Sequence, residues 1–457
     1  MALKQIAAMT ALADGAGEVI NKSVCEVAGG WLALVKTEGG KRLAFASQGE
    51  ASLTAMWKDV EKSVDVKGVH VDIMALNANN AAVVRRFVKW AAPTACGTKG
   101  TSIGFSDWLG CADAFVTDLF VKRQLKPVLV DFTPEDSEAL QRNFLEAVDT
   151  ATWGVLEAGY KEGYGANAAG LKSEEEIVKA LLYGYSMIGF DCSEKINLGI
   201  EKLSDEAVEK RFEEFNETFR AALHASYLNA EFKVGTSTVT FTENQLHRIV
   251  LEYGEAIMHI QFIYNSYLKN TPWDIDFELA LSKPGKVLTP QEHYLIANEL
   301  QRNSVKLAAI CLDPLKDAEA LADNLQIHCE IADTFGYRLS FANAEMALAN
   351  PAAAVKYLHN KVHFKLNNIL WMSAVRLTAA KDAVLYAKLA EAAGVEAIPA
   401  DSICGSKEAK EFALSYKNVL NPKDSTLASE MKAFLLAHQE EYAEAVRANV
   451  GVFLKKI

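Results

Sequence analysis

From residue 101 to residue 367 the sequence alternates short apolar runs with longer amphipathic stretches. Apolar runs of this length are typical of strands buried in a parallel sheet, and the stretches between them are typical of crossover helices. Strands are predicted at 101–105, 127–132, 164–167, 185–191, 274–280, 306–312, 338–343 and 363–367, with helices at 137–160, 173–182, 291–302 and 317–334. Eight parallel strands with helices between them close as a (β/α)8 barrel of the TIM type, for which a doubly wound sheet is the rival fold.

The remaining segments predict smaller units around this barrel. Residues 1–98 read as a small N-terminal α/β domain, with strands at 24–35, 42–46 and 69–73, helices at 52–64 and 79–91, and a linker at 93–100. The barrel itself is expected over 99–425, with a helical insertion at about 203–270 that holds helices at 205–215 and 245–267 around a β-like run at 236–241. Residues 426–457 are predicted as a C-terminal helical tail.

Composition excludes several classes of function. Among 457 residues the net charge is −12, which disfavours binding to nucleic acid, and no basic block offsets it. No apolar run is long enough for a membrane span, and the N-terminus, with Lys4 and Asp14, lacks the features of a signal peptide. Seven scattered cysteines without a C-x-x-C pair indicate free thiols in a cytoplasmic protein.

In a barrel of this type the active site lies where the strands end, so the residues at those ends are the candidates for chemistry. They are carboxylates and amides without a histidine: Asp107, Asp131, Asn167, Asp191, Glu278, Asp313, Asn343, Glu345 and Asn367. His359 and His363 are four residues apart, but a turn or a strand start between them argues against a metal-binding pair on one helix. Cys192 follows a strand end and is interpreted as a buried structural thiol.

Several longer motifs resemble the tagaturonate epimerase family, whose members are metal-dependent enzymes that interconvert tagaturonate and fructuronate. The resemblance covers most of the chain from residue 101 to the end. It is carried by the runs at 104–110, 149–166, 171–173, 184–191, 276–279, 292–294, 335–340 and 363–365. It implies the barrel fold and, for the family, a divalent metal ion that assists epimerisation of a sugar acid.

The departures from the family pattern fall on the residues that the resemblance would make functional. Where the family has Gly-Ala-Asp-Ala-Asp-His, this chain has Gly165-Ala-Asn-Ala-Ala-Gly170, which loses both carboxylates and the histidine. A second histidine-containing run is replaced by residues 342–347, a family arginine by Trp108, and polar runs by residues 310–314 and 366–369. The metal ligands of the family are therefore not retained, and no cofactor is expected.

The retained polar residues define the predicted site. The catalytic candidates are Glu278, Asp107 and Asp191, the substrate-binding candidates are His293, Lys365 and Asn367, and no metal ligand is assigned. Bracing of the barrel mouth by hydrogen bonds and ion pairs is the alternative role for these residues.

Three functions stay open at this stage. The first is a catalytically degenerate family member with a structural or regulatory role, forming a homo-oligomer or pairing with an active paralogue. The second is an active carbohydrate-acid epimerase or isomerase with a rebuilt metal site. The third is a protein that binds a hexuronate or another sugar acid without converting it.

Overall fold

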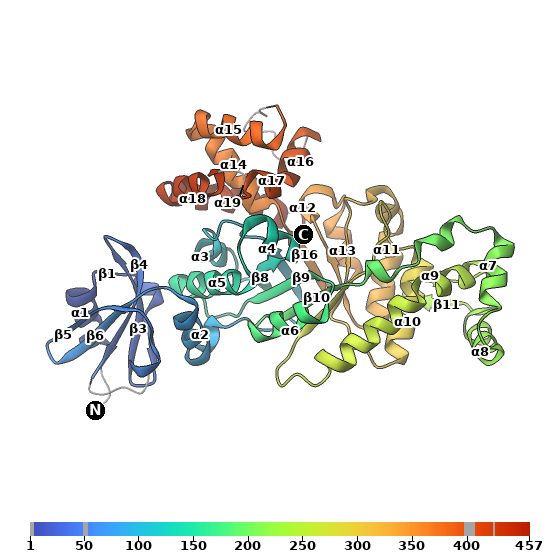
Figure 1. Ribbon diagram of the computed structural model, residues 1–457, viewed down its shortest axis with the longest axis horizontal. Helices are drawn as coiled ribbons and strands as arrows, with labels where there is room; N and C mark the ends of the chain where they lie inside the picture. Colours follow the sequence, from blue (N-terminus) through green and yellow to red (C-terminus); the bar gives the residue numbers. More distant parts are fainter. Residues whose placement is uncertain (1–3, 49–53, 397–406, 424–425) are drawn as a thin grey trace.

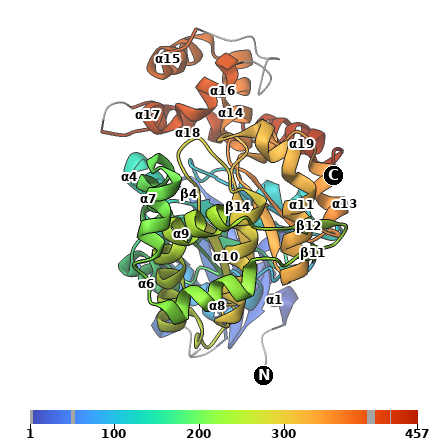
Figure 2. The same cartoon turned by 90° about the vertical axis from the view of Figure 1, so that its right-hand side faces the viewer.

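The structure is a computed structural model that describes residues 4–48, 54–396, 407–423 and 426–457. A central barrel carries the N-terminal sheet on one side and a green helical insertion on the opposite side (Figure 1). The C-terminal helices, in orange and red, lie across one end of the barrel in both views (Figures 1 and 2). None of the helices described is long and apolar enough to cross a membrane.

The eight strands predicted from residue 101 onward all form, and they close into one barrel in which every neighbouring pair is parallel. The predicted (β/α)8 fold is therefore confirmed, and the doubly wound alternative is excluded. The strands are β7 (Thr101–Phe105), β8 (Leu125–Phe132), β9 (Gly165–Leu171), β10 (Met187–Asp191), β13 (Asp276–Ala280), β14 (Ala309–Leu312), β15 (Arg338–Phe341) and β16 (Val362–Leu366).

Helices cover the outside of the barrel, and most begin with side chains that cap free backbone N–H groups. Thr289 and Glu292 form such a capping box at the start of α10, as Ser173 and Glu176 do at α6. The barrel helices are α3 (Asp113–Val116), α4 (Pro134–Leu140), α5 (Phe144–Ala158), α6 (Glu174–Leu182), α10 (Pro290–Arg302), α11 (Ala318–Phe335), α12 (Ala344–Ala347) and α13 (Pro351–Tyr357).

One predicted helix, 137–160, is two helices in the structure. Gln141 adopts a left-handed conformation at the end of α4, which stops that helix, and the Asn143 side chain then caps α5. The break is set by backbone conformation, which the apolar pattern of the segment does not report.

The N-terminal unit is an antiparallel sheet of six strands in which alternate side chains face two different partners. Leu32, Leu34 and Phe45 face α2 (Ala78–Phe87) and α5, whereas Ala33 and Ala44 face α1 (Gln5–Ala16). Small residues on that second face let the alanine-rich α1 approach closely. The strands are β1 (Glu18–Val19), β2 (Cys25–Val27), β3 (Gly30–Thr37), β4 (Gly40–Ser47), β5 (Val60–Val66) and β6 (Val69–Met74).

The helix predicted at 52–64 is wrong where the structure describes it. Residues 54–56 form a short 3-10 turn, and residues 60–66 form β5, which pairs antiparallel with β6. Lys67 and Gly68 both have positive φ, as the two central residues of a type I′ hairpin turn require. The alternation of charged and apolar residues in β5 was the strand signal, and residues 51–53 lie outside the described part of the chain.

The insertion packs beside the barrel and contains three helices rather than the two expected. They are α7 (Asp205–Phe212), α8 (Glu217–Tyr227) and α9 (Glu243–Ile263), with a small hairpin of β11 (Phe232–Val234) and β12 (Ser237–Val239) between the last two. The Asn216 side chain caps α8, a helix that lies between the segments predicted at 205–215 and 236–241 and was not itself predicted.

The C-terminal helices form one layer over the barrel end at which the strands finish. The layer includes α14 (Ile369–Lys381), α15 (Ala383–Ala393), α16 (Lys407–Leu414), α17 (Tyr416–Val419), α18 (Leu427–Ala437) and α19 (Gln439–Leu454). Because α14 packs on α19, the last predicted helical segment is anchored to the helix that follows β16. Six cysteines in the described ranges are free thiols, and Cys404 lies outside those ranges.

At the other end of the barrel, a buried carboxylate holds the linker that leads into the first barrel strand. Asp276, at the start of β13, accepts hydrogen bonds of 2.7 Å from the Cys96 N–H and 3.0 Å from the Gly97 N–H. Its Oδ2 also lies 3.7 Å from Nη2 of Arg338, a side chain with no exposed surface. The linker predicted at 93–100 therefore passes under the barrel and is fixed there.

Replacing Asp276 by Ala should destabilise the folded chain by about 3–5 kcal/mol, because it leaves Arg338 buried without its carboxylate partner. The measurement is the midpoint of urea unfolding, followed by circular dichroism. The exposed Asp274→Ala is the matched control and should leave the midpoint unchanged. Equal midpoints for the two variants would contradict the assigned role of Asp276.

Candidate active site

A cavity of about 400 Å³ opens where the barrel strands end, and we call it the mouth. It is placed where barrel enzymes carry their active sites. The following residues line it: Ser106, Trp108, Asp131, Thr133, Glu135, Asp136, Ala169, Gly170, Gly189, Glu278, Ala280, Cys311, Asp313, Ala342, Asn343, Lys365, Asn367, Asn368, Leu414, Tyr416 and Lys417.

The floor of the mouth is a buried group of three charged side chains from three strands. Lys365 Nζ lies 2.5 Å from Oε1 of Glu278 and 3.8 Å from Oδ1 of Asp131. At most 5% of each side chain is exposed. Buried charges are tolerated only when they are paired, so Lys365 compensates two carboxylates that would otherwise repel each other.

Two amides complete this group and hold the carboxylates in place. Asn167 donates to Oδ1 of Asp131 at 3.1 Å, and Asn367 donates to Oδ2 of the same carboxylate at 3.2 Å. The Asn367 amide also lies 3.1 Å from the Ser106 hydroxyl, and its carbonyl accepts from the Asn343 N–H. Both oxygens of Asp131 are therefore occupied, and its orientation is determined by its neighbours.

Burial and pairing shift the ionisation of these groups in opposite directions. Burial raises the pKa of Asp131 to about 6, even though the Lys365 ammonium lowers it. Burial alone would lower the pKa of Lys365, but Asp131 and Glu278 outweigh it and raise that pKa above its ordinary value. Glu345 lies behind the mouth, and burial raises the pKa of its carboxyl group to about 7. A carboxyl group that titrates near neutrality is suited to proton transfer.

Two acceptor atoms of this buried group have no hydrogen-bond partner. They are Oε2 of Glu278 and Oδ1 of Asn167, both fully buried. Gly189 packs against the group: a Cβ added there would be 3.2 Å from Oδ1 of Asn167 and 3.3 Å from Oε1 of Glu278, closer than ordinary van der Waals contact. A side chain at this position would therefore displace these groups.

The C-terminal layer contributes one wall of the mouth. The ring of Tyr416 stacks on Trp108 at a centroid distance of 3.3 Å, and its hydroxyl donates to Asp136 at 2.5 Å. Lys417 pairs with Glu135 at 2.6 Å on the more exposed rim. Trp108 therefore lines the cavity, whereas Leu366 and Ile369, the other apolar replacements, lie in the hydrophobic core.

Of the predicted site residues, the structure brings Glu278, Lys365 and Asn367 together in the mouth. Asp107 lies at the end of β7, but both its oxygens accept backbone N–H groups, those of Gly110 and Ala112, so it shapes the following loop. Asp191 caps the turn after β10 by accepting from the Ser193 N–H. Neither of these two carboxylates lines the cavity.

The structure does not bring His293 to the mouth. It is fully buried in α10, where its ring nitrogens lie 2.9 Å from Nδ1 of His328 and 2.6 Å from the Tyr337 hydroxyl. Burial and the neighbouring His328 lower its pKa well below the ordinary value, so it is a neutral packing residue. His293 is therefore not part of the mouth, and the residues that join Glu278 and Lys365 at its floor are Asp131 and Asn167, which were noted only as strand-end residues.

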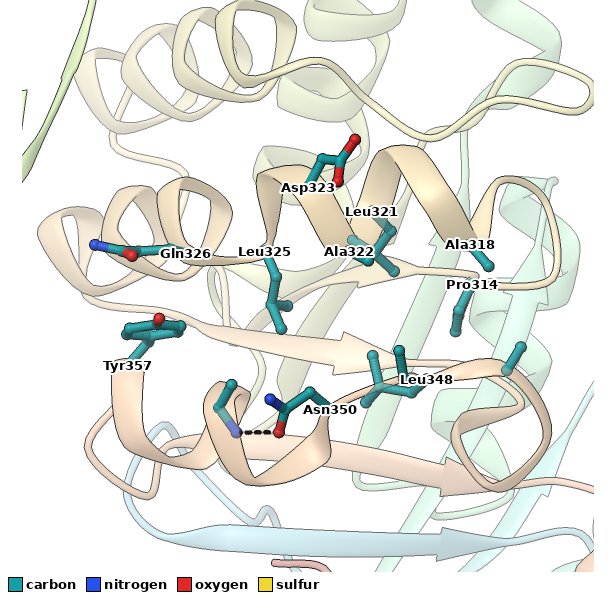
Figure 3. Close-up of a pocket in the computed structure, with 13 residues that line it drawn as sticks. Pro314, Ala318, Leu321, Ala322, Asp323, Leu325, Gln326, Leu348, Asn350 and Tyr357 are labelled. Carbon is teal, nitrogen blue, oxygen red and sulfur yellow. Dashed lines mark hydrogen bonds between the residues drawn. The ribbon is translucent and has the colours of Figure 1, made fainter.

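A smaller cavity of about 240 Å³ lies outside the barrel, between α11 and α13. Figure 3 shows Leu321, Leu325 and Leu348 facing it, with the Asn350 side chain turned to cap α13 through the Ala353 N–H. Its acidic residue, Asp323, is exposed. Without a buried charged group, this cavity is a weaker candidate for chemistry than the mouth.

Comparison with known proteins identifies relatives along nearly the whole chain. Residues 20–397 match the family model described as tagaturonate epimerase. The tagaturonate/fructuronate epimerase of Thermotoga maritima is 26% identical over 383 residues, covering 81% of this chain and 78% of that protein. Crystal structures of the fructuronate-tagaturonate epimerase of Cohnella laeviribosi, native and with one glycerol, each superpose with a TM-score of 0.87 at 26% identity and 98% coverage of both chains.

The raised pKa of Asp131 predicts how stability depends on pH. An unfolded aspartate titrates near pH 3.9. Between about pH 4 and about pH 6 the folded chain therefore keeps a proton that the unfolded chain releases. The free energy of unfolding should fall as the pH rises through this window, by about 1.4 kcal/mol per unit and up to about 3 kcal/mol in all.

Asp131→Asn should remove this pH dependence. The free energy of unfolding of the variant should therefore rise by about 2–3 kcal/mol relative to that of the wild type as the pH is raised from 4 to 7. Urea unfolding of both proteins across this range measures the difference. Asp323→Asn, at an exposed site, should follow the wild type. Parallel pH profiles for wild type and Asp131→Asn would show that Asp131 titrates normally.

Proposed function

The chain belongs to the tagaturonate epimerase family, and we propose that its mouth binds a hexuronate or a similar sugar acid without metal-dependent epimerisation. The observation that carries the proposal is the Lys365, Glu278 and Asp131 group, which supplies its own buried cation at the floor of the mouth. A ligand can bind above this charged group without any added metal ion.

The residues of the mouth do not fit a divalent ion. The donors are carboxylates, amides, hydroxyls and the thiol of Cys311, without an imidazole. The Lys365 ammonium lies at the point where the two carboxylates converge. A second cation beside this ammonium would be repelled in surroundings of low dielectric constant. Asp131 is in addition saturated by two amides. No step of the proposed function therefore uses a metal ion.

The floor of the mouth suits the hydroxyl groups of a sugar. Glu278 lines the cavity, and its Oε2 is a buried acceptor without a partner. A sugar hydroxyl is a donor that can satisfy it. The Cohnella relative forms a complex with glycerol, a small polyol, which is consistent with recognition of hydroxyl groups in this family.

The carboxylate of a sugar acid is best placed at the rim. The walls carry Asp136, Asp313 and Glu135 in addition to the floor carboxylates, so an anionic group is disfavoured deep in the cavity. Lys417 on the rim is paired only with the exposed Glu135 and can exchange it for a ligand carboxylate. The proposed ligand therefore lies with its hydroxyls on Glu278 and its acid group near α17.

Saturating tagaturonate or fructuronate should raise the melting temperature of the full chain by at least about 2 °C, with chelator present throughout. Glu278→Gln should lose most of this shift, because the amide weakens the acceptor for ligand hydroxyls and unpairs Lys365. Each shift is measured against the same variant without ligand.

Glu292→Gln is the control for that measurement. Glu292 is another buried glutamate paired with a lysine, Lys283, at 2.7 Å, but it does not line the mouth. This variant should keep the wild-type shift. No shift with either sugar acid, or a shift that requires an added divalent ion, would contradict the proposed function.

A second candidate function, epimerisation without a metal ion, is favoured by one observation. Burial raises the pKa of Asp131 to about 6, which is close to the value expected of a general acid or base working at neutral pH. Tagaturonate and fructuronate differ at C4, two carbons from the ketone at C2, so their epimerisation would break and re-form the C3–C4 bond. Asp131 would take the proton of the C4 hydroxyl, and the electron pair of the broken bond would pass to an enolate that the Lys365 ammonium stabilises. Addition of this enolate to the other face of the C4 aldehyde would re-form the bond, and Asp131 would return the proton to the C4 oxygen.

Proton NMR of tagaturonate and fructuronate in deuterated water separates the two candidates. An active epimerase should interconvert them, and Asp131→Asn should lower kcat at least about 100-fold. Ligand-induced stabilisation without conversion, in the presence or absence of added metal ions, would support binding alone.

A further inference from the structure

A second group of potential ligands lies in the insertion, away from the mouth. His247 and Glu243 are one turn apart on α9, and His224 faces them from α8. The two Nε2 atoms lie 2.8 Å apart, and Oε1 of Glu243 lies 4.0 Å from Nε2 of His224. Within the described residues, this is the one set of three histidine, cysteine or acidic side chains whose ligand atoms converge within 4.8 Å.

The ring of His247 is oriented by its other nitrogen. Nδ1 lies 2.9 Å from Oε2 of Glu209 on α7, and since a carboxylate only accepts, Nδ1 carries the proton. In the neutral ring, the lone pair of Nε2 then points toward His224. Phe212 stacks on His247 at a centroid distance of 3.6 Å and keeps the ring in this plane. A histidine that donates its second N–H to a carboxylate is the usual arrangement of a metal ligand.

The surroundings of the group favour a cation. The adjoining surface hollow is strongly acidic, with one lysine among its lining residues: Asp205, Glu206, Glu209, Lys210, Glu213, Glu243 and Asn244. An acidic hollow of this kind raises the local concentration of divalent ions.

We propose that His224, Glu243 and His247 bind one zinc-class divalent ion, with Glu209 as the residue that positions His247. Two imidazoles and one carboxylate are a donor set that Zn²⁺ accepts, and water completes a fourth position. The ion ties α8 to α9 and strengthens the packing of the insertion. The site is independent of the mouth and of the proposed sugar-acid binding.

Binding requires only a small movement. A tetrahedral ion with bonds of about 2.0–2.1 Å to two nitrogens separates them by about 3.3 Å. The histidines are 2.8 Å apart, so His224 moves away by roughly half an ångström. One third of its side chain is exposed, whereas His247 is fully buried, so His224 has the freedom to move. A direct hydrogen bond between the two rings is the competing explanation of the short distance.

Zinc titration of the chelator-treated full chain, monitored by competition with a chromophoric zinc indicator, tests the site. The wild type should bind one equivalent that His224→Ala loses, with affinity reduced more than about 100-fold, and Glu209→Gln should weaken binding about 10-fold or more. Zinc should also raise the melting temperature of the wild type but not that of His224→Ala.

Two controls separate this site from other zinc binding. His359→Ala removes a histidine that is 73% exposed and outside the group, and Glu278→Gln alters the mouth, so both should bind zinc as the wild type does. Glu243→Gln, at an exposed position, gives a second loss-of-site variant that leaves the helix packing intact. Equal zinc affinity in the wild type and in His224→Ala, or no saturable binding below about 1 mM in the wild type, would overturn the proposal.

Discussion

The charged group at the floor of the mouth is the interaction on which the site depends. A closed barrel removes its inward-facing side chains from water, so every charge there requires a partner inside the protein. Lys365 provides that partner for Glu278 and for Asp131, and two asparagines orient the second carboxylate. Removing one member leaves the other charges buried and unpaired, which is more costly than the loss of a single surface ion pair.

The polar character of the barrel interior extends below this group. Arg338 donates to the Ser102 hydroxyl at 2.8 Å, and the same hydroxyl lies 2.8 Å from Nδ1 of His363. Burial and the nearby cations lower the pKa of His363 well below its ordinary value, so it remains neutral between Arg338 and Lys365. Polar side chains therefore occupy the barrel interior from the linker to the mouth, in place of the branched apolar layers that usually fill such barrels.

Much of the fold follows from local sequence patterns. Each of the eight barrel strands was predicted because its apolar run is bounded by polar or turn-forming residues, and the observed strands overlap every predicted range. The errors have two causes. The left-handed Gln141 is a matter of backbone conformation at a single residue, which a pattern of apolar side chains does not record. At residues 60–66 the alternation of a strand was present in the sequence but was interpreted as a helix.

The candidate site was predictable in part. Glu278 and Asn367 were found because parallel strands in a barrel must end at the same face, so residues at strand ends converge whatever their spacing in sequence. Lys365 was found as a polar residue retained in a run that resembles the family. Asp131 and Asn167 were seen at strand ends, but their interaction depends on which strands are neighbours. Tyr416 could not be found in this way, because it reaches Asp136 across 280 residues of sequence through the packing of the C-terminal layer.

The sequence by itself therefore determined the order of the eight barrel strands and the set of carboxylates and amides at their ends, because these depend on local periodicity and on the direction of parallel strands. Only the tertiary structure decided that Lys365 pairs with Glu278, that His293 is buried away from the mouth, and that His224 meets His247. Those contacts join distant elements, and their distances result from how helices and strands pack, which no short segment of sequence encodes.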